Sequence, residues 1–318
     1  MMLSRRSAVL ALASTIAAPI LAPGRSVAQS PAPTVIRLGT SPDDGVISVL
    51  YAQRMGYFRD AGIEVDVQKL NSGSAVAAAV AGGAIDIGRS SVLPLINGHA
   101  RGLPFVLVAG STAHVPGDPD SSMLVITDSP IRTARDLSGK TVAVAGLFDL
   151  NWLSTKVWID ANGGDSTTVS LIEIPNTAML EALIAHRVDA ATLSEPYMSL
   201  DLGSGKTRTL GDTVGAISTH VDEAAWFTTT GYVQAHREVV QRFRSIVARA
   251  AAYTNTHHAE TVDLLAAFTG LDPAAIKGVP RSTTALSLDP ADIQPMIDAA
   301  AKYKVIAAAF PAREIIFN

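Results

Sequence analysis

The 318-residue sequence contains no cysteine, has no excess of basic residues and has no long apolar run beyond its first 28 residues. Without cysteine the chain cannot form a disulfide, an iron–sulfur cluster, a thiolate nucleophile or a Cys-ligated zinc site. Its formal net charge of −4 removes the electrostatic case for nucleic-acid binding. Several enzyme classes and the DNA- and RNA-binding proteins are therefore excluded. At 48% hydrophobic residues, the chain is also too apolar to be disordered.

The first 28 residues have the pattern of an export signal. Arg5 and Arg6 precede a mostly apolar run over 8–22, and Ser26-Val27-Ala28 is typical of a cleavage site made of small residues. A membrane anchor would need about 20 predominantly apolar residues, more than this run supplies. The paired arginines are also typical of twin-arginine export, so the Tat and Sec routes both stay open. We expect cleavage after about Ala28 and export of a soluble protein.

Short apolar stretches alternate with helical patterns along the next 75 residues. Strands are expected at 35–38, 63–67, 85–87 and 105–108, with helices at 47–55, 75–81 and 92–99. A turn-rich segment at 116–120 interrupts this series. A second series follows, with strands expected at 141–145, 169–174 and 190–193. From about residue 228 the pattern is helical, with one apolar face predicted over 239–247 and a last helix that begins at Asp289-Pro290. Such alternation favours an α/β fold with a parallel sheet in each of two lobes.

Small polar residues follow the strands of the first series. Open α/β sheets bind ligands at the carboxyl ends of their strands, where the following helices present free backbone N–H groups. The candidates in this lobe are Ser41, Asp43, Ser72, Ser74, Ser90, Ser91 and Ser111. Each of them could instead cap a helix. Arg89 could meet an anion in the same cleft or pair with an acid such as Asp86, and the sequence leaves both open.

The second series places a facing set of polar and aromatic residues after its strands. The candidates are Phe148, Asn151, Asn176, Glu195 and Tyr197. Glu195 could accept hydrogen bonds from a ligand amine or amide, and the two aromatic rings could stack on a planar group or pack in the core. No catalytic residue, metal site or cofactor motif is predicted. The stretch 203–207 matches only the end of a phosphate-binding loop, and His257-His258 is a poor metal pair.

Four stretches of the sequence resemble the solute-binding proteins of ABC importers in the group that takes nitrate, alkanesulfonates, taurine and thiamine-precursor pyrimidines. The similarity is carried by 51–58 with 62–65, by 82–87, by 136–144, and by 180–191 continuing to Glu195-Pro196-Tyr197. The most specific of these is Asp-Leu-Ser-Gly-Lys-Thr-Val-Ala-Val at 136–144. The resemblance is strong from 35 to 197 and looser in the helical tail.

This resemblance implies a type II periplasmic binding fold, in which two α/β lobes joined by two crossing segments close on a ligand. It implies a first lobe of 35–120 with 233–318, a second lobe of 128–224, and hinge crossings at 121–127 and 225–232. It further implies a periplasmic, monomeric receptor that delivers a small organic anion or zwitterion, such as a sulfonate, taurine or nitrate, to a membrane permease with its cytoplasmic ATPase.

Two alternatives stay open at this stage. The ligand could be a thiamine-precursor pyrimidine or another aromatic compound. The chain could also be a secreted enzyme or a sensor-associated receptor with the same fold, which agrees less well with the sequence. The family includes an enzyme that depends on a cysteine-rich motif, and the absence of cysteine together with the export signal argues against that activity.

Overall fold

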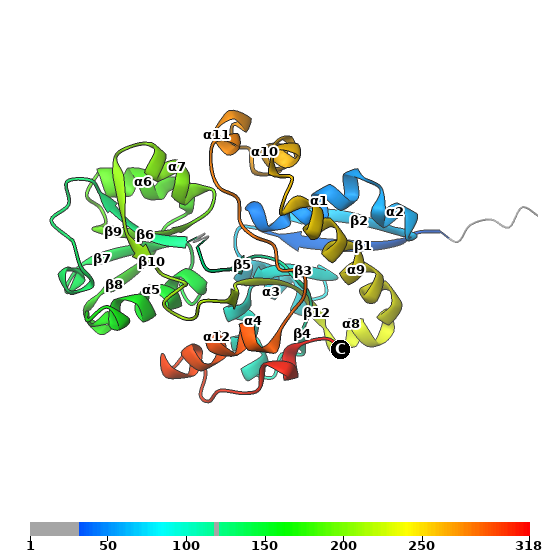
Figure 1. Ribbon diagram of the computed structural model, residues 1–318. Coiled ribbons are helices and arrows are strands. Elements are labelled where there is room, and N and C mark those ends of the chain that lie inside the picture. The colour runs from blue at the N-terminus through cyan, green and yellow to red at the C-terminus, as the bar shows by residue number, and fades with distance from the viewer. Residues whose placement is uncertain (1–31, 118–120) are drawn as a thin grey trace, which may run out of the picture. The chain divides into compact units, whose positions relative to one another are not determined.

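The computed structural model of the chain describes residues 32–117 and 121–318. Its elements form two α/β lobes, each built around one five-stranded sheet (Figure 1). The α/β fold with two lobes that the sequence predicts is therefore confirmed. The export signal predicted over residues 1–28 lies outside the described residues.

The first sheet has the strand order β2-β1-β3-β12-β4. Its strands are β1 (Thr34–Thr40), β2 (Ile63–Lys69), β3 (Ile87–Ser91), β4 (Phe105–Gly110) and β12 (Ala224–Thr229). β1 pairs in parallel with β2 and β3, whereas β12 pairs antiparallel with β3 and β4. The expected parallel sheet therefore includes one antiparallel strand, which arrives from the second lobe.

The second sheet has the strand order β10-β6-β9-β7-β8. Its strands are β6 (Ser121–Ile126), β7 (Thr141–Val144), β8 (Ser170–Glu173), β9 (Ala190–Ser194) and β10 (Thr207–Asp212). β7 pairs in parallel with β8 and β9, and β6 pairs antiparallel with β9 and β10. As in the first sheet, the strand that comes from the other lobe is antiparallel to its neighbour.

The hinge crossings expected at 121–127 and 225–232 do not fall between the sheets. These residues form most of β6 and β12, because the apolar side chains of Met123, Leu124 and Trp226 are fully buried within the lobes. The described residues that lie between the sheets are 111–117 and 213–223. Within these stretches β5 (Ala113–His114) pairs antiparallel with β11 (Val221–Asp222), so the two connections are hydrogen-bonded to each other.

Helices cover both sheets. They are α1 (Ile47–Arg54), α2 (Tyr57–Asp60), α3 (Gly73–Ala81), α4 (Val92–Ala100), α5 (Leu150–Ala161), α6 (Asn176–Ile184), α7 (Tyr197–Gly203), α8 (Thr230–Ala235), α9 (Arg237–Thr254), α10 (Val262–Thr269), α11 (Pro273–Lys277) and α12 (Pro290–Lys302). The expected cap of α12 is confirmed: Asp289 accepts a hydrogen bond from the N–H of Ala291, and Pro290 opens the helix.

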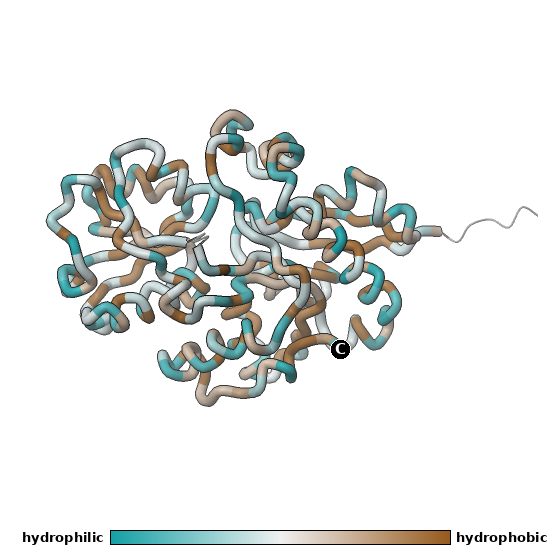
Figure 2. The backbone as a smooth tube through the Cα atoms, viewed as in Figure 1, coloured by the Kyte–Doolittle hydropathy of each residue, from teal (hydrophilic) through white to brown (hydrophobic). Residues whose placement is uncertain are grey.

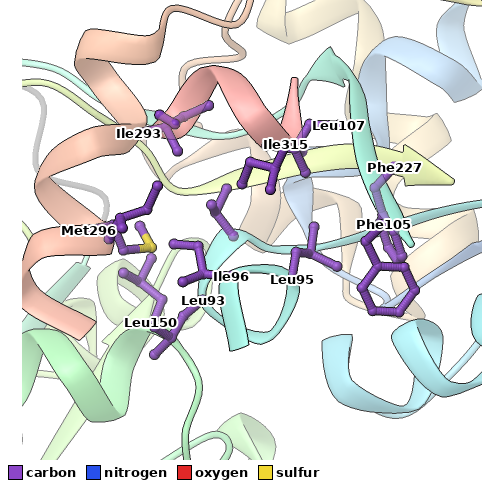
Figure 3. Packing of buried hydrophobic residues seen from close by; sticks show 14 of the residues in the cluster. Leu93, Leu95, Ile96, Phe105, Leu107, Leu150, Phe227, Ile293, Met296 and Ile315 are labelled. Atoms are coloured by element: carbon purple, nitrogen blue, oxygen red, sulfur yellow. The ribbon is translucent and has the colours of Figure 1, made fainter. Parts of the chain in front are cut away.

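One apolar cluster is shared by the two lobes. Leu150 of α5, in the second lobe, belongs to the same buried cluster as Leu93 and Ile96 of α4 and Met296 of α12 (Figure 3). The Tyr303 hydroxyl also donates a hydrogen bond to Oδ2 of Asp160 at 2.8 Å, which joins the end of α12 to α5. Side chains of this size each contribute about 1.5–3 kcal/mol when fully buried, so this cluster stabilises the side of the molecule on which the lobes remain in contact.

Hydrophobic residues concentrate along the strands inside each lobe, and hydrophilic residues mark many of the outer turns (Figure 2). The apolar face predicted on α9 is buried as expected, with Val239, Val240, Phe243, Ile246 and Val247 all facing the core. In the part of the chain that the structure describes, no helix is both long enough and apolar enough to cross a membrane.

Candidate functional site

A cavity of about 730 Å³ lies between the two lobes. Its walls come from the loops after β1 and β2 and from β3 in the first lobe, and from the segments that follow β7, β8 and β9 in the second. Small-molecule sites commonly occupy clefts of about 300–1,000 Å³ at such interfaces. The cavity therefore lies at the strand ends, where the sequence predicts the ligand site.

The structure brings eight of the twelve candidate residues to this cavity. They are Ser41, Asp43, Ser72, Ser91, Asn151, Asn176, Glu195 and Tyr197. Ser72 also caps α3, since its Oγ accepts a hydrogen bond from the N–H of Ala75 at 3.2 Å. Capping a helix and lining the cleft are thus compatible roles for one side chain.

Four candidates lie elsewhere. Ser74 is exposed on the first turn of α3, and Phe148 is 54% exposed with its ring against Trp152. Ser90 and Ser111 are buried behind the wall. Because β3 begins at Ile87 and runs through Ser91, the alternation of a strand turns Ser90 away from the side that Arg89 and Ser91 share.

Arg89 is part of the cavity wall, but its guanidinium is bonded within the protein. It pairs with Asp43 at 2.7 Å and donates to Ser111 Oγ at 2.5 Å and Thr112 Oγ1 at 2.8 Å, and only 5% of the residue is exposed. The alternative partner, Asp86, pairs with Arg37 instead. Arg89 therefore fixes the loop after β1 in place.

Gly45 is in close contact with this guanidinium. A Cβ atom at this position would lie 1.7 Å from Nη2 of Arg89 and 2.5 Å from Oγ1 of Thr112. The loop can approach the arginine only because residue 45 has no side chain, and the backbone carbonyl of Gly45 accepts a hydrogen bond from Ser111.

We expect Gly45→Ala to lower the free energy of unfolding by about 1–3 kcal/mol, because the added methyl group must displace the buried arginine. Urea denaturation followed by circular dichroism measures the change. Gly203→Ala is the matched control, since a Cβ there meets no atom within 4 Å. If the two variants are equally stable, the packing of Gly45 on Arg89 does not constrain the loop.

A buried ion pair holds the same loop from behind. Asp44, at the cavity wall, pairs with Arg281, and both side chains are almost fully buried. The Nε of Arg281 donates to Asp44 Oδ2 at 2.8 Å, and the N–H of Ser282 donates to the same oxygen at 2.8 Å. These contacts hold the segment after α11 against the wall of the cavity.

In the second lobe, Asp149 caps α5 and reaches across the cleft. Its carboxylate accepts hydrogen bonds from the N–H of Leu150 at 2.8 Å and from the hydroxyl of Ser91 in the first lobe. Burial raises the pKa of Asp149, the hydrogen bonds from Ser91 and Leu150 oppose that rise, and the charges of Asp43 and Glu173 add to it. The site therefore contains one carboxylate that contacts both lobes.

Several other polar wall residues of the second lobe are hydrogen-bonded within the protein. Asn151 accepts from Ser121 at 3.1 Å and donates to Ser194 at 3.3 Å. Glu195 accepts from the hydroxyl of Ser199 at 2.6 Å. Burial raises the pKa of Tyr197, with a smaller contribution from Asp43. No three His, Asp or Glu side chains among the described residues are arranged to hold a metal ion.

Several charged wall residues are not among those that the sequence places at the cleft. They are Asp44, Lys69, Glu173 and Glu223. Lys69 and Glu173 are the last residues of β2 and β8, and the candidates were sought only among residues that follow the strands. Asp44 depends on a partner 237 positions away, which no local pattern reveals.

Two α/β lobes with a ligand-sized cavity between them, joined by two crossing segments, define the periplasmic binding protein fold. The chain belongs to the family described as NMT1/THI5 like, which matches residues 44–261.

Individual relatives agree with this assignment. The chain is 26% identical over 257 residues to a putative aliphatic sulfonates-binding protein of Bacillus subtilis, covering 79% of this chain and 75% of the relative. It has a TM-score of 0.73 and 22% identity with the periplasmic aliphatic sulphonate binding protein SsuA from Escherichia coli, covering 90% and 92% of the two chains.

A third match is to an enzyme and is shorter. Over 102 residues the chain is 26% identical to the 4-amino-5-hydroxymethyl-2-methylpyrimidine phosphate synthase of Schizosaccharomyces pombe. This stretch covers 32% of this chain and 28% of that protein. The fold is also shared with the desulfurization enzyme DSZB, with a TM-score of 0.65 and 17% identity, covering 89% of this chain and 96% of that one.

Proposed function

We propose that this protein is the substrate-binding component of an ABC importer and captures a small organic anion or zwitterion between its two lobes. The observation that carries this proposal is the cavity of about 730 Å³ walled by strand-end loops of both lobes. A ligand that contacts both walls binds the closed form better than the open form and shifts the population toward it. The closed, loaded protein then docks on a membrane permease, which works with a cytoplasmic ATPase.

The proposal extends to location and assembly. Export through the signal at residues 1–28 brings the chain to the periplasm, where a permease can meet it. The receptor acts as a monomer with the first lobe formed by both ends of the chain, and it turns over nothing. The similarity of the chain to sulfonate-binding proteins supports this proposal.

Two helix N-termini supply the anion-binding side of the cleft. α3 and α6 each have nine residues and begin at the cavity, with Gly73 and Asn176 in its wall. The free N–H groups and dipole of a helix N-terminus favour negative charge, and Lys69 adds a positive charge nearby. A sulfonate or carboxylate group suits this side of the cleft.

A thermal-shift panel of sulfonates, taurine, nitrate, carboxylates and pyrimidines tests the receptor function. A ligand present at about one hundred times its dissociation constant is expected to add about 2.7 kcal/mol to the free energy of unfolding. Mass spectrometry of small molecules that co-purify with the protein supplies an unbiased second readout. If no panel member stabilises the protein and nothing co-purifies with it, the receptor function is refuted.

A second candidate is a receptor for an aminopyrimidine, favoured by the match to the pyrimidine phosphate synthase and by Glu195 and Tyr197 in the wall. An enzyme on the same fold would convert its ligand. Incubating the purified protein with each stabilising compound and following the compound by mass spectrometry distinguishes a receptor from an enzyme, because a receptor releases the compound unchanged.

A further inference from the structure

The walls of the cleft contain more carboxylates than cations. The acidic wall residues are Asp43, Asp44, Asp149, Glu173, Glu195 and Glu223, whereas the basic ones are Lys69 and Arg89. A receptor for a simple anion needs the opposite balance, because a net negative cleft repels the ligand that it should attract. The wall composition therefore bears on what the ligand carries besides an anionic group.

Internal ion pairs occupy both arginines at the cleft. Arg89 is paired with Asp43, and Arg281, which lies behind the wall, is paired with Asp44. Among the basic wall residues, Lys69 lies outside these pairs. Since Arg89 is only 5% exposed and bonded to three side chains, it has little capacity left for a ligand anion.

Asp149 is the carboxylate best placed to meet a ligand. Its described hydrogen-bond donors, Ser91 and Leu150, are neutral, and the charges that act on it come from the acidic side chains of Asp43 and Glu173. An enclosed carboxylate among like charges is costly in free energy, and an opposite charge within about 4–6 Å relieves that cost. A cation on the ligand would supply that charge.

An independent observation also points to a donor on the ligand. Asn176 lies in the wall of the cavity at the start of α6, and its side-chain oxygen is buried without a hydrogen-bond partner among the described residues. Buried acceptors are nearly always satisfied in native proteins. The carbonyl of Asn176 thus needs an N–H or O–H group that the described protein does not provide.

We infer that the ligand carries a protonated nitrogen that lies against the carboxylate of Asp149. This inference rests on the proposed receptor function and defines the ligand as a zwitterion or an aminated cation. The anionic end of a zwitterion would face Lys69 and the N-terminus of α3, and the nitrogen would face Asp149. Nitrate and sulfonates without an amine lack the group that this wall recognises.

Matched pairs of compounds test the inference by isothermal titration calorimetry at pH 7.5. The pairs are taurine with ethanesulfonate and β-alanine with propionate. In at least one pair, we expect the aminated member to bind at least tenfold more tightly. Asp149→Asn should weaken the binding of that member at least tenfold and leave its partner unchanged, because only the aminated member uses the carboxylate.

Asparagine is also a good N-cap residue, so the Asp149→Asn variant should keep α5, and circular dichroism checks that it does. Asp66→Asn is the matched control, because it removes an equal charge from an exposed position on β2. Pairs that bind with equal affinity, tighter binding of the compounds without an amine, or equal effects of the two variants would overturn the inference but leave the receptor function intact. If no compound binds and none co-purifies, the receptor function itself fails.

Discussion

Replacing Arg281 with alanine is expected to lower the free energy of unfolding by about 3–5 kcal/mol, because it leaves the buried carboxylate of Asp44 without its counter-charge. Natural domains have only about 5–15 kcal/mol of total stability, so the change should be plain in a urea denaturation curve. The same variant removes the contact of the segment after α11 with Asp44 in the cavity wall. We therefore expect it to weaken ligand binding as well.

Two further variants make this prediction specific. Arg59→Ala removes an arginine whose side chain is 85% exposed and should change stability by no more than about 0.5 kcal/mol. The double variant Asp44→Leu/Arg281→Met removes both charges and should recover part of the loss, because no unpaired charge stays buried. An Arg281→Ala protein within about 1 kcal/mol of wild type would contradict the assigned role of the pair.

The second large effect concerns pH and the hydrogen-bonded connections between the lobes. Asp222 on β11 is 3% exposed, and burial together with the nearby charge of Asp292 raises its pKa to about 7. Between pH 3.8 and about 7, the carboxyl of Asp222 is therefore protonated in the folded state and ionised in the unfolded state. The stabilising contribution is present at low pH and is lost as the pH rises through about 7.

Asp222→Asn should therefore be more stable than wild type at pH 8, by up to about 4 kcal/mol, and equally stable near pH 4. Chemical denaturation at both pH values measures the difference. Asp136→Asn is the control, and its expected effect on stability at pH 8 has the opposite sign. Hydrogen bonds from the N–H groups of Arg132 and Thr133 lower the pKa of Asp136, so this variant should be less stable than wild type. Equal stability of Asp222→Asn and wild type at pH 8 would show that Asp222 is not held protonated.

Much of the fold could be read from local sequence patterns. A short apolar stretch identified β1, alternating apolar residues identified β2, and turn residues identified the loops after them. The Asp289-Pro290 pair identified the start of α12. These features depend on residues a few positions apart. The strands β6 and β12 were instead taken for crossings, because a strand added to a sheet from the other lobe is defined by its partners and not by its own sequence.

The site was predictable to the extent that it follows from strand ends. Ser72 and Glu195 reach the cavity because the loops after parallel strands meet at one edge. The exact strand register, which turns Ser90 inward, and the pairing of Arg89 with Asp43 both depend on contacts between distant segments. Such contacts also decide the charge balance of the cleft, on which the nature of the ligand depends.

The central claim, closure of two lobes over a ligand, is tested most directly by a distance between spin labels on the two lobes. Because the chain has no cysteine, Ala78→Cys on α3 and Glu181→Cys on α6 would label one exposed site in each lobe without further changes. A pair within the first lobe, Arg59→Cys with Ala78→Cys, is the control.

Pulsed electron paramagnetic resonance should give a shorter and narrower distance distribution between the lobes when a stabilising compound saturates the protein. The control pair should not change. An inter-lobe distribution that is identical with and without that compound would contradict the account.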